Sequence, residues 1–102
     1  MPNFIRVTGI SDLNPGESKV VFVEDEEIAL FNVDGKFFAI SNSCPHQGGP
    51  LGEGNLEGEV ITCPLHGWRF NVKNGANATM PNVKVSCYKV KVEGNDVLVS
   101  LD

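Results

Sequence analysis

Two short motifs in the middle of the chain carry residue types that bind metals. The first is Cys44-Pro45-His46, and the second, after sixteen further residues, is Cys63-Pro64-Leu65-His66. Thiolate sulfur and imidazole nitrogen suit zinc, copper and iron–sulfur centres. Each motif offers one sulfur and one nitrogen, so two similar loops must face each other to supply four ligands. We therefore predict one metal centre held by Cys44, His46, Cys63 and His66.

Two simpler interpretations of these residues fit the motifs less well and stay open on the residues alone. Structural zinc sites usually pair like with like, as Cys-x₂₋₄-Cys and His-x₃₋₅-His, whereas both motifs here are mixed. A Cys44–Cys63 disulfide would leave both histidines unexplained. The chain has three cysteines, and an odd number argues against a disulfide framework. Cys87 lies beyond the motifs in a strand-like segment, and we expect it to be a buried free thiol.

The motifs and their surroundings resemble the ligand boxes of Rieske proteins, which hold a [2Fe–2S] cluster through two Cys and two His. The similarity continues through His46–Leu51, Gly58–Ile61 and His66–Val72 to a turn at Asn74-Gly75. Thr79-Met80-Pro81 resembles the proline-bearing third loop that covers the cluster in this family. The resemblance spans nearly the whole chain.

This resemblance implies a cofactor, its ligands and a subtype. Cys44 and Cys63 would bind the buried iron of one [2Fe–2S] cluster, and His46 and His66 would bind the outer iron. Imidazole in place of thiolate on one iron places Rieske potentials at roughly −150 to +300 mV.

High-potential members of the family carry an extra cysteine in each box and two hydroxyl residues after the second histidine. Here Gly49 and Leu65 stand at the cysteine positions, and Trp68 and Phe70 stand at the hydroxyl positions. Without hydroxyl donors the added negative charge of the reduced state is less stabilised. We therefore expect a soluble ferredoxin with a potential at the low end of the family range.

Short runs of β-favouring residues on both sides of the motifs predict the strands that hold them. These runs are Phe4–Val7, Lys19–Val23, Ile28–Val33, Lys36–Ile40, Tyr88–Val92 and Asp96–Ser100. Asp34-Gly35 and Gly94-Asn95 predict hairpin turns, and Ser11-Asp12-Leu13 predicts a brief helical turn. We predict an all-β Rieske fold, in which an antiparallel β-sandwich or incomplete barrel carries an inserted cluster-binding subdomain of two loops.

Length and charge limit the class of protein further. The 102 residues suit one domain, with base strands at about 1–41 and 82–102 and the cluster-binding subdomain at about 42–81. A net charge of −5 lacks the basic footprint of a nucleic-acid binder. No apolar run approaches the roughly 20 residues that span a membrane. No signal peptide is evident, so we expect a cytoplasmic protein.

The sequence holds no nucleophile–base pair and no flavin or nicotinamide fingerprint, so we expect no substrate turnover of its own. The resemblance implies a one-electron carrier between an NAD(P)H-dependent flavoprotein reductase and a terminal oxygenase, an aromatic-ring dioxygenase, through transient protein contacts. The alternative that it implies is the small [2Fe–2S] subunit of an assimilatory NADH-dependent nitrite reductase. The excess of acidic residues suits a transient carrier slightly better.

Overall fold

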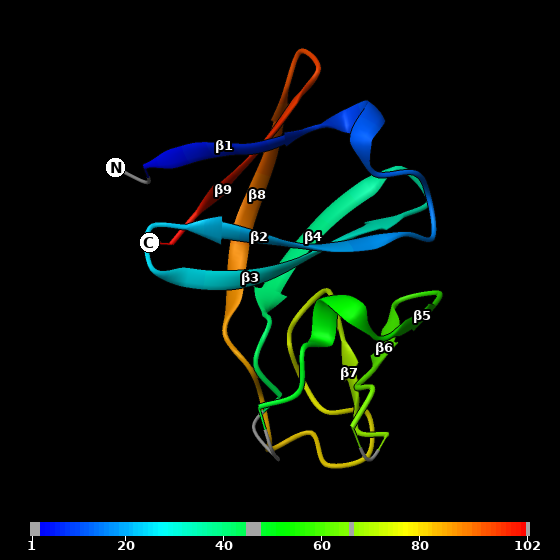
Figure 1. The fold of residues 1–102 in the computed structure, drawn as a ribbon. Coiled ribbons are helices and arrows are strands. Elements are labelled where there is room, and N and C mark those ends of the chain that lie inside the picture. The colour runs from blue at the N-terminus through cyan, green and yellow to red at the C-terminus, as the bar shows by residue number, and fades with distance from the viewer. Residues whose placement is uncertain (1–2, 45–47, 66, 102) are drawn as a thin grey trace.

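In the computed structural model, which describes residues 3–44, 48–65 and 67–101, two antiparallel sheets lie one below the other (Figure 1). The larger sheet has the strand order β1-β9-β8-β4-β3-β2, and the smaller has the order β5-β6-β7. The strands are β1 (Phe4–Gly9), β2 (Ser18–Val23), β3 (Glu26–Val33), β4 (Lys36–Ser41), β5 (Asn55–Glu57), β6 (Val60–Thr62), β7 (Arg69–Asn71), β8 (Cys87–Glu93) and β9 (Asp96–Ser100). Two 3₁₀ turns are η1 (Ile10–Asp12) and η2 (Leu51–Glu53). Over the described ranges, no helix has the length and apolar character to cross a bilayer.

The tight turns of the larger sheet follow from their residues. Asp34 and Gly35 both adopt positive φ, 52° and 90°, as the predicted two-residue hairpin requires. The Gly35 N–H donates to the Asn32 side-chain oxygen at 2.8 Å. The turn between β2 and β3 is shorter than the acidic run Glu24–Glu27, because β3 already begins at Glu26. Glu24 makes this tight turn with a positive φ of 57°.

The larger sheet curls until its two edge strands approach each other, which confirms the predicted incomplete barrel. The Lys19 ammonium on β2 donates to the Thr8 hydroxyl on β1 at 3.2 Å. The Thr8 hydroxyl and the Gly9 N–H in turn donate to the Asp12 carboxylate, at 3.1 and 3.0 Å. The Gly9 N–H is the main cause that holds the pKa of Asp12 below its usual value, with the Thr8 hydroxyl next. The predicted helical turn is thus built into the closure of the barrel.

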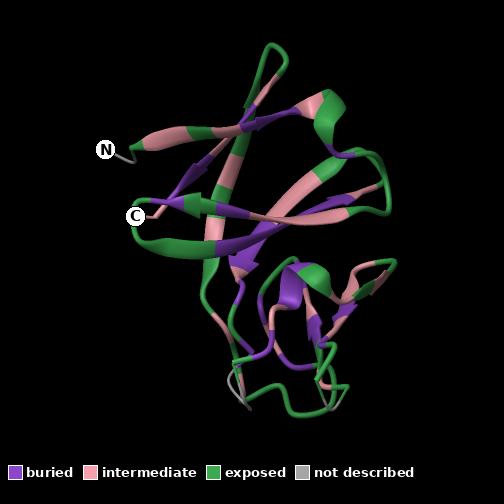
Figure 2. Ribbon diagram, viewed as in Figure 1, coloured by how far each residue is buried: buried purple, intermediate pink, exposed green. Residues whose placement is uncertain are grey.

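Strand β3 is buried on both faces, so it joins two cores (Figure 2). Ile28 and Leu30 pack inside the barrel with the apolar side chains of β2 and β9. Ala29 and Phe31 point the other way, because successive side chains of a strand alternate between faces. They pack in the core that lies between the two sheets. That second core also contains Cys44 and Cys63.

We expect Phe31→Ala to lower the free energy of unfolding by about 3–5 kcal/mol, the usual effect of emptying a buried phenylalanine site. Phe31 is fully buried in the core between the two sheets. Phe22→Ala is the matched control: the ring is 68% exposed on β2, and its removal should change stability by less than about 0.5 kcal/mol. Chemical denaturation measures both. Equal losses would contradict this account of the core.

Candidate metal centre

The first cysteine opens a loop that is closed at its base by two backbone hydrogen bonds. The Cys44 N–H donates to the Gly49 carbonyl at 2.9 Å, and the Gly48 N–H donates to the Cys44 carbonyl at 2.7 Å. Gly48 adopts a positive φ of 70°, which favours glycine. An isolated bridge between Ser43 and Pro50 extends the closure by one pair. Cys44 therefore lies at the start of a loop whose base is held by backbone hydrogen bonds.

The second cysteine opens a loop of the same construction. The loop joins β6 to β7, and the Cys63 N–H donates to the Trp68 carbonyl at 2.7 Å. This bond spans five residues, the same separation as the bond from Cys44 to Gly49 in the first loop. Gly67 adopts a positive φ of 74° near the end of the loop. The two motifs thus form two similar loops, as their composition predicts.

The folded chain brings the two cysteines together. Cys44 and Cys63 are free thiols with 1% and 2% of their surfaces exposed. Both belong to the core between the two sheets. Burial raises the pKa of the Cys63 thiol; the Leu65 N–H opposes this rise, and Cys44 adds to it. A bare thiolate is therefore disfavoured in this core.

The two predicted histidine ligands, His46 and His66, lie outside the described residues. Within the described ranges, no group of three or more His, Cys, Asp or Glu side chains could hold a metal ion. The structure thus brings together Cys44 and Cys63 of the four predicted ligands.

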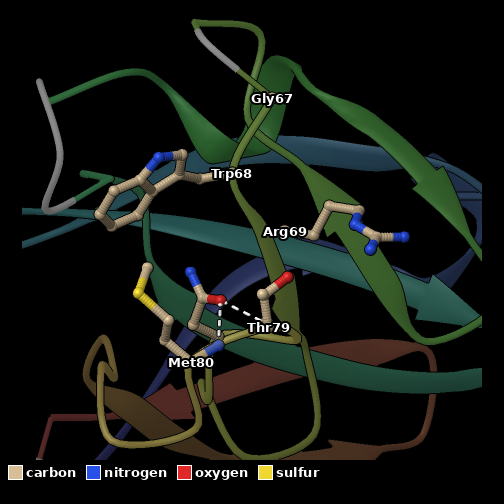
Figure 3. Close-up of a pocket in the computed structure, with 6 residues that line it drawn as sticks. Gly67, Trp68, Arg69, Thr79 and Met80 are labelled. Atoms are coloured by element: carbon tan, nitrogen blue, oxygen red, sulfur yellow. Dashed lines mark hydrogen bonds between the residues drawn. The ribbon is translucent and has the colours of Figure 1, made fainter.

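A third segment lies beside the second loop and depends on a buried asparagine. Asn77 is 4% exposed, and its side-chain oxygen accepts the N–H groups of Thr79 and Met80 at 2.8 and 2.9 Å. A hollow of about 190 Å³ lies between this turn and the second loop. Trp68 and Met80 face each other across it, and Arg69 is directed away (Figure 3). Sequence reasoning missed Asn77; the turn-forming pattern Asn-x-Thr before Met80-Pro81 was the available signal.

Asn42 is a second buried asparagine, and its hydrogen bonds hold the chain that flanks the first loop. Its side-chain oxygen accepts the Gly52 N–H at 2.7 Å, its carbonyl accepts the Leu51 N–H at 2.7 Å, and its own N–H donates to the Glu27 carbonyl at 3.1 Å. The side chain is 4% exposed. Asn42 therefore ties η2 to the start of β3. An acidic hollow of about 240 Å³ lies alongside, lined by Asp25, Glu26, Glu27, Ser41, Asn42, Ser43, Gly48 and Pro50.

Comparison with known proteins agrees with this arrangement. The profile of the Rieske [2Fe-2S] domain matches residues 3–94. This chain belongs to the Rieske family. The biphenyl dioxygenase ferredoxin subunit of Pseudomonas sp. (strain KKS102) is 37% identical to it over 98 residues, which are 94% of this chain and 90% of that protein. The predicted family is confirmed, and so is the predicted cofactor type, one Rieske [2Fe–2S] cluster.

Solved structures give the same answer for the fold. One chain in a complex of reduced oxygenase and oxidized ferredoxin in carbazole 1,9a-dioxygenase is 35% identical, with a TM-score of 0.87 over 95% of this chain and 92% of that one. A putative NADH-dependent nitrite reductase small subunit from Mycobacterium tuberculosis has a TM-score of 0.90 over 98% and 96%. Its identity is 23%, so that likeness speaks for the Rieske fold alone.

The described part of this Rieske site fits an iron–sulfur cluster. Two soft sulfur donors meet in an apolar core, at the starts of two loops of equal construction. Burial raises the pKa of the Cys63 thiol, and a positively charged iron would compensate the charge of a thiolate there. The Leu65 N–H supplies a donor of the kind that tunes cluster sulfurs.

The positions of the extra cysteines in high-potential Rieske proteins face each other here without a disulfide. A Cβ atom on Gly49 would lie 2.6 Å from the Cys63 sulfur and 3.2 Å from the Leu65 Cγ. Gly49 is thus a close-approach position, where the backbone of the first loop touches the sulfur and side chain of the second. The lack of room for a side chain explains why glycine stands at position 49, since the φ of Gly49 lies outside the left-handed region that also favours glycine.

We expect Gly49→Ala to lower the free energy of unfolding by about 1–3 kcal/mol and to reduce the iron content, because the new methyl group displaces the Cys63 sulfur. Denaturation and iron assay measure the two effects. The double variant Gly49→Ala/Leu65→Ala removes the Leu65 Cγ but leaves the Leu65 Cβ at 3.3 Å and the Cys63 sulfur at 2.6 Å, so it should not restore iron. Wild-type iron content and stability in the single variant would refute the contact.

The expectation that Cys87 is a buried free thiol is wrong. The residue is exposed rather than buried, and its thiol donates to the Lys73 carbonyl at 3.4 Å. The reason lies in the alternation of β8: Cys87 shares the outward face with Lys89, which is also exposed, while Tyr88 and Val90 pack against the barrel core. The thiol therefore belongs to the surface of the Rieske domain.

Proposed function

We propose that this protein is a one-electron carrier that passes electrons from an NAD(P)H-dependent flavoprotein reductase to the terminal oxygenase of an aromatic-ring dioxygenase. The observation that carries the proposal is the buried pair Cys44 and Cys63, which pack in one core at the starts of two similar loops of a Rieske domain. When bound, a [2Fe–2S] cluster accepts and releases one electron at a time.

We infer that Cys44 and Cys63 hold one iron and that His46 and His66 hold the other. The support is the mixed motif spacing together with the convergence of the two thiols. The segment of about 42–81 would act as the cluster-binding subdomain on a base formed by about 1–41 and 82–102. Its own three-stranded sheet and the core shared with Phe31 support this division.

The chain's own residues keep water from the thiols. Leu51, Ile61, Phe70 and Val72 are fully buried around Cys44 and Cys63, and Trp68 packs against the same core. Phe70 carries no hydroxyl, so it offers no donor to a sulfur. This apolar shell supports a potential at the low end of the Rieske range.

The choice of partners rests on the relatives. The biphenyl relative is the ferredoxin subunit of a dioxygenase, and the carbazole dioxygenase structure is a complex of ferredoxin with oxygenase. Exposed apolar side chains, Leu65 in the second loop at 42% and Met80 in the neighbouring segment at 43%, suit a transient protein contact. The flavoprotein donor is inferred from the need for single electrons. Three free cysteines suit the reducing cytoplasm that we propose as the location.

A nitrite reductase small subunit is the alternative function that the sequence raised. Its support is the fold alone, and no residue-level observation favours it. Stable co-purification with a large siroheme- and flavin-bearing chain would replace the carrier by this alternative.

The deciding experiment is electron paramagnetic resonance of the dithionite-reduced protein, with iron and acid-labile sulfide assayed on the same sample. We expect a Rieske-type spectrum with two irons and two sulfides per chain, the composition of the cluster. A silent spectrum with one zinc per chain would overturn the proposal.

A further inference from the structure

Residues 77–83 form a closed loop that lies beside the second cysteine loop. At the base of this 77–83 loop the Asn77 N–H donates to the Val83 carbonyl at 2.8 Å, and the Val83 N–H donates to the Met80 carbonyl at 2.8 Å. The Ala78 N–H donates to the carbonyl of Arg69 on β7, also at 2.8 Å. The base of the loop is therefore fastened to the smaller sheet.

The tip of the 77–83 loop depends on the buried side chain of Asn77. The Asn77 side-chain oxygen accepts the N–H groups of Thr79 and Met80 at 2.8 and 2.9 Å, and the residue is 4% exposed. One oxygen thus satisfies two successive backbone donors, and leaving either donor unpaired would cost free energy. The Met80 side chain is 43% exposed, so burial alone does not hold it in place. The bonds to Asn77 fix the backbone that carries it.

Met80 forms one wall of the hollow of about 190 Å³, and Trp68 forms the opposite wall (Figure 3). A space of this size admits water. Behind the hollow, Trp68 packs against the core that contains Cys44 and Cys63. The position of Met80 therefore controls how much water reaches Trp68 and the cysteine core.

We propose that Asn77 is a positioning residue, which holds Met80 opposite Trp68 through the two N–H groups that it accepts and so limits the access of water to the metal centre. The consequence for electron transfer rests on the proposed function. Reduction adds one negative charge behind the Trp68 wall, and the exclusion of water leaves that charge less stabilised. Loss of the Asn77 bonds should therefore raise the midpoint potential.

The test compares full-length proteins of equal iron content by tryptophan fluorescence and by redox titration. Trp68 is the single tryptophan of the chain, so its fluorescence reports on this wall alone. We expect acrylamide to quench Asn77→Ala more strongly than the wild type, and the midpoint potential of Asn77→Ala to shift upward. Asn82→Ala is the matched control, because it removes an exposed asparagine from the same loop and should leave both values unchanged. Asn77→Asp keeps an oxygen that accepts both N–H groups, so it should restore wild-type quenching.

Met80→Ala separates positioning from a general loss of stability. It shortens one wall of the hollow while the Asn77 oxygen keeps both backbone donors, so it should increase quenching by itself. Adding Asn77→Ala to it should increase quenching little further, because the effects of residues that act through one another do not add.

Additive effects of the Asn77 and Met80 substitutions would overturn the inference. So would wild-type quenching or an unchanged potential in an Asn77→Ala protein that circular dichroism shows to be folded. Stronger quenching of Asn77→Ala in a chain that binds zinc but no cluster would leave the positioning role of Asn77 standing and remove the proposed function. A Rieske-type spectrum together with unchanged quenching would remove only the inference.

Discussion

We expect the Cys63→Ser variant to purify without iron or acid-labile sulfide and to give no Rieske-type spectrum after reduction. Cys63 is 2% exposed, packs in the same core as Cys44 and lies against Gly49 of the first loop, so its sulfur sits where the two ligand loops meet. Serine keeps the size of the side chain but replaces a soft sulfur by a hard oxygen that stays protonated, which removes an iron ligand. The loss should be essentially complete, and iron and sulfide assays measure it directly.

Cys87→Ser is the matched control for this experiment. It removes the exposed thiol on β8 and should leave iron content and spectrum unchanged. Circular dichroism of Cys63→Ser separates loss of the ligand from loss of the fold. A folded Cys63→Ser protein with the full iron content would rule out Cys63 as a ligand.

The double variant His46→Cys/His66→Cys should lower the midpoint potential by about 250 mV or more. The estimate compares roughly −150 to +300 mV for Rieske centres with about −400 mV for clusters held by four thiolates. Two neutral imidazoles are replaced by two thiolates, so the added negative charge makes the uptake of an electron less favourable. A redox titration followed by electron paramagnetic resonance measures the shift, and the spectrum should change to that of an all-cysteine cluster.

Gln47→Cys is the control for the histidine substitutions, because it adds a thiol directly after His46 in sequence without removing a predicted ligand. Its potential should stay near the wild-type value. An unchanged potential and spectrum in the double variant would refute the assignment of His46 and His66 to iron. This outcome would leave the Rieske fold intact and redirect the search for ligands.

Gly49 and Leu65 stand where high-potential Rieske proteins carry their extra cysteines, so no disulfide joins the two loops in this chain. In this chain the two positions touch, with the Leu65 side chain against Gly49 and the Cys63 sulfur beside both. The second loop is thereby positioned by a close backbone approach and by the hydrogen bond from Cys63 to Trp68. Such packing holds the loops together without a covalent link.

The sequence alone determined the features that depend on residue type and local geometry. The mixed Cys–His motifs identified the family and the cofactor type, because few metal sites use such ligands at such spacing. The turns at Asp34-Gly35 and after Glu93 were predictable, because glycine and aspartate adopt the φ values that two-residue hairpins need. The six strands of the larger sheet were predictable to within a few residues from their β-favouring runs, whereas the short strands β5, β6 and β7 of the smaller sheet were not predicted.

Only the tertiary structure decided what depends on which parts of the chain meet. The shared packing of Cys44 and Cys63 in one core joins residues on two separate loops. Asn42 and Asn77 organise their loops through buried side chains that, in sequence, resemble ordinary turn residues. Cys87 is exposed because it lies on the outward face of β8. Which face of a strand points outward depends on the parts of the fold that cover its other face. Residue type fixes what a side chain is able to do, whereas burial and neighbours arise from contacts distant in sequence.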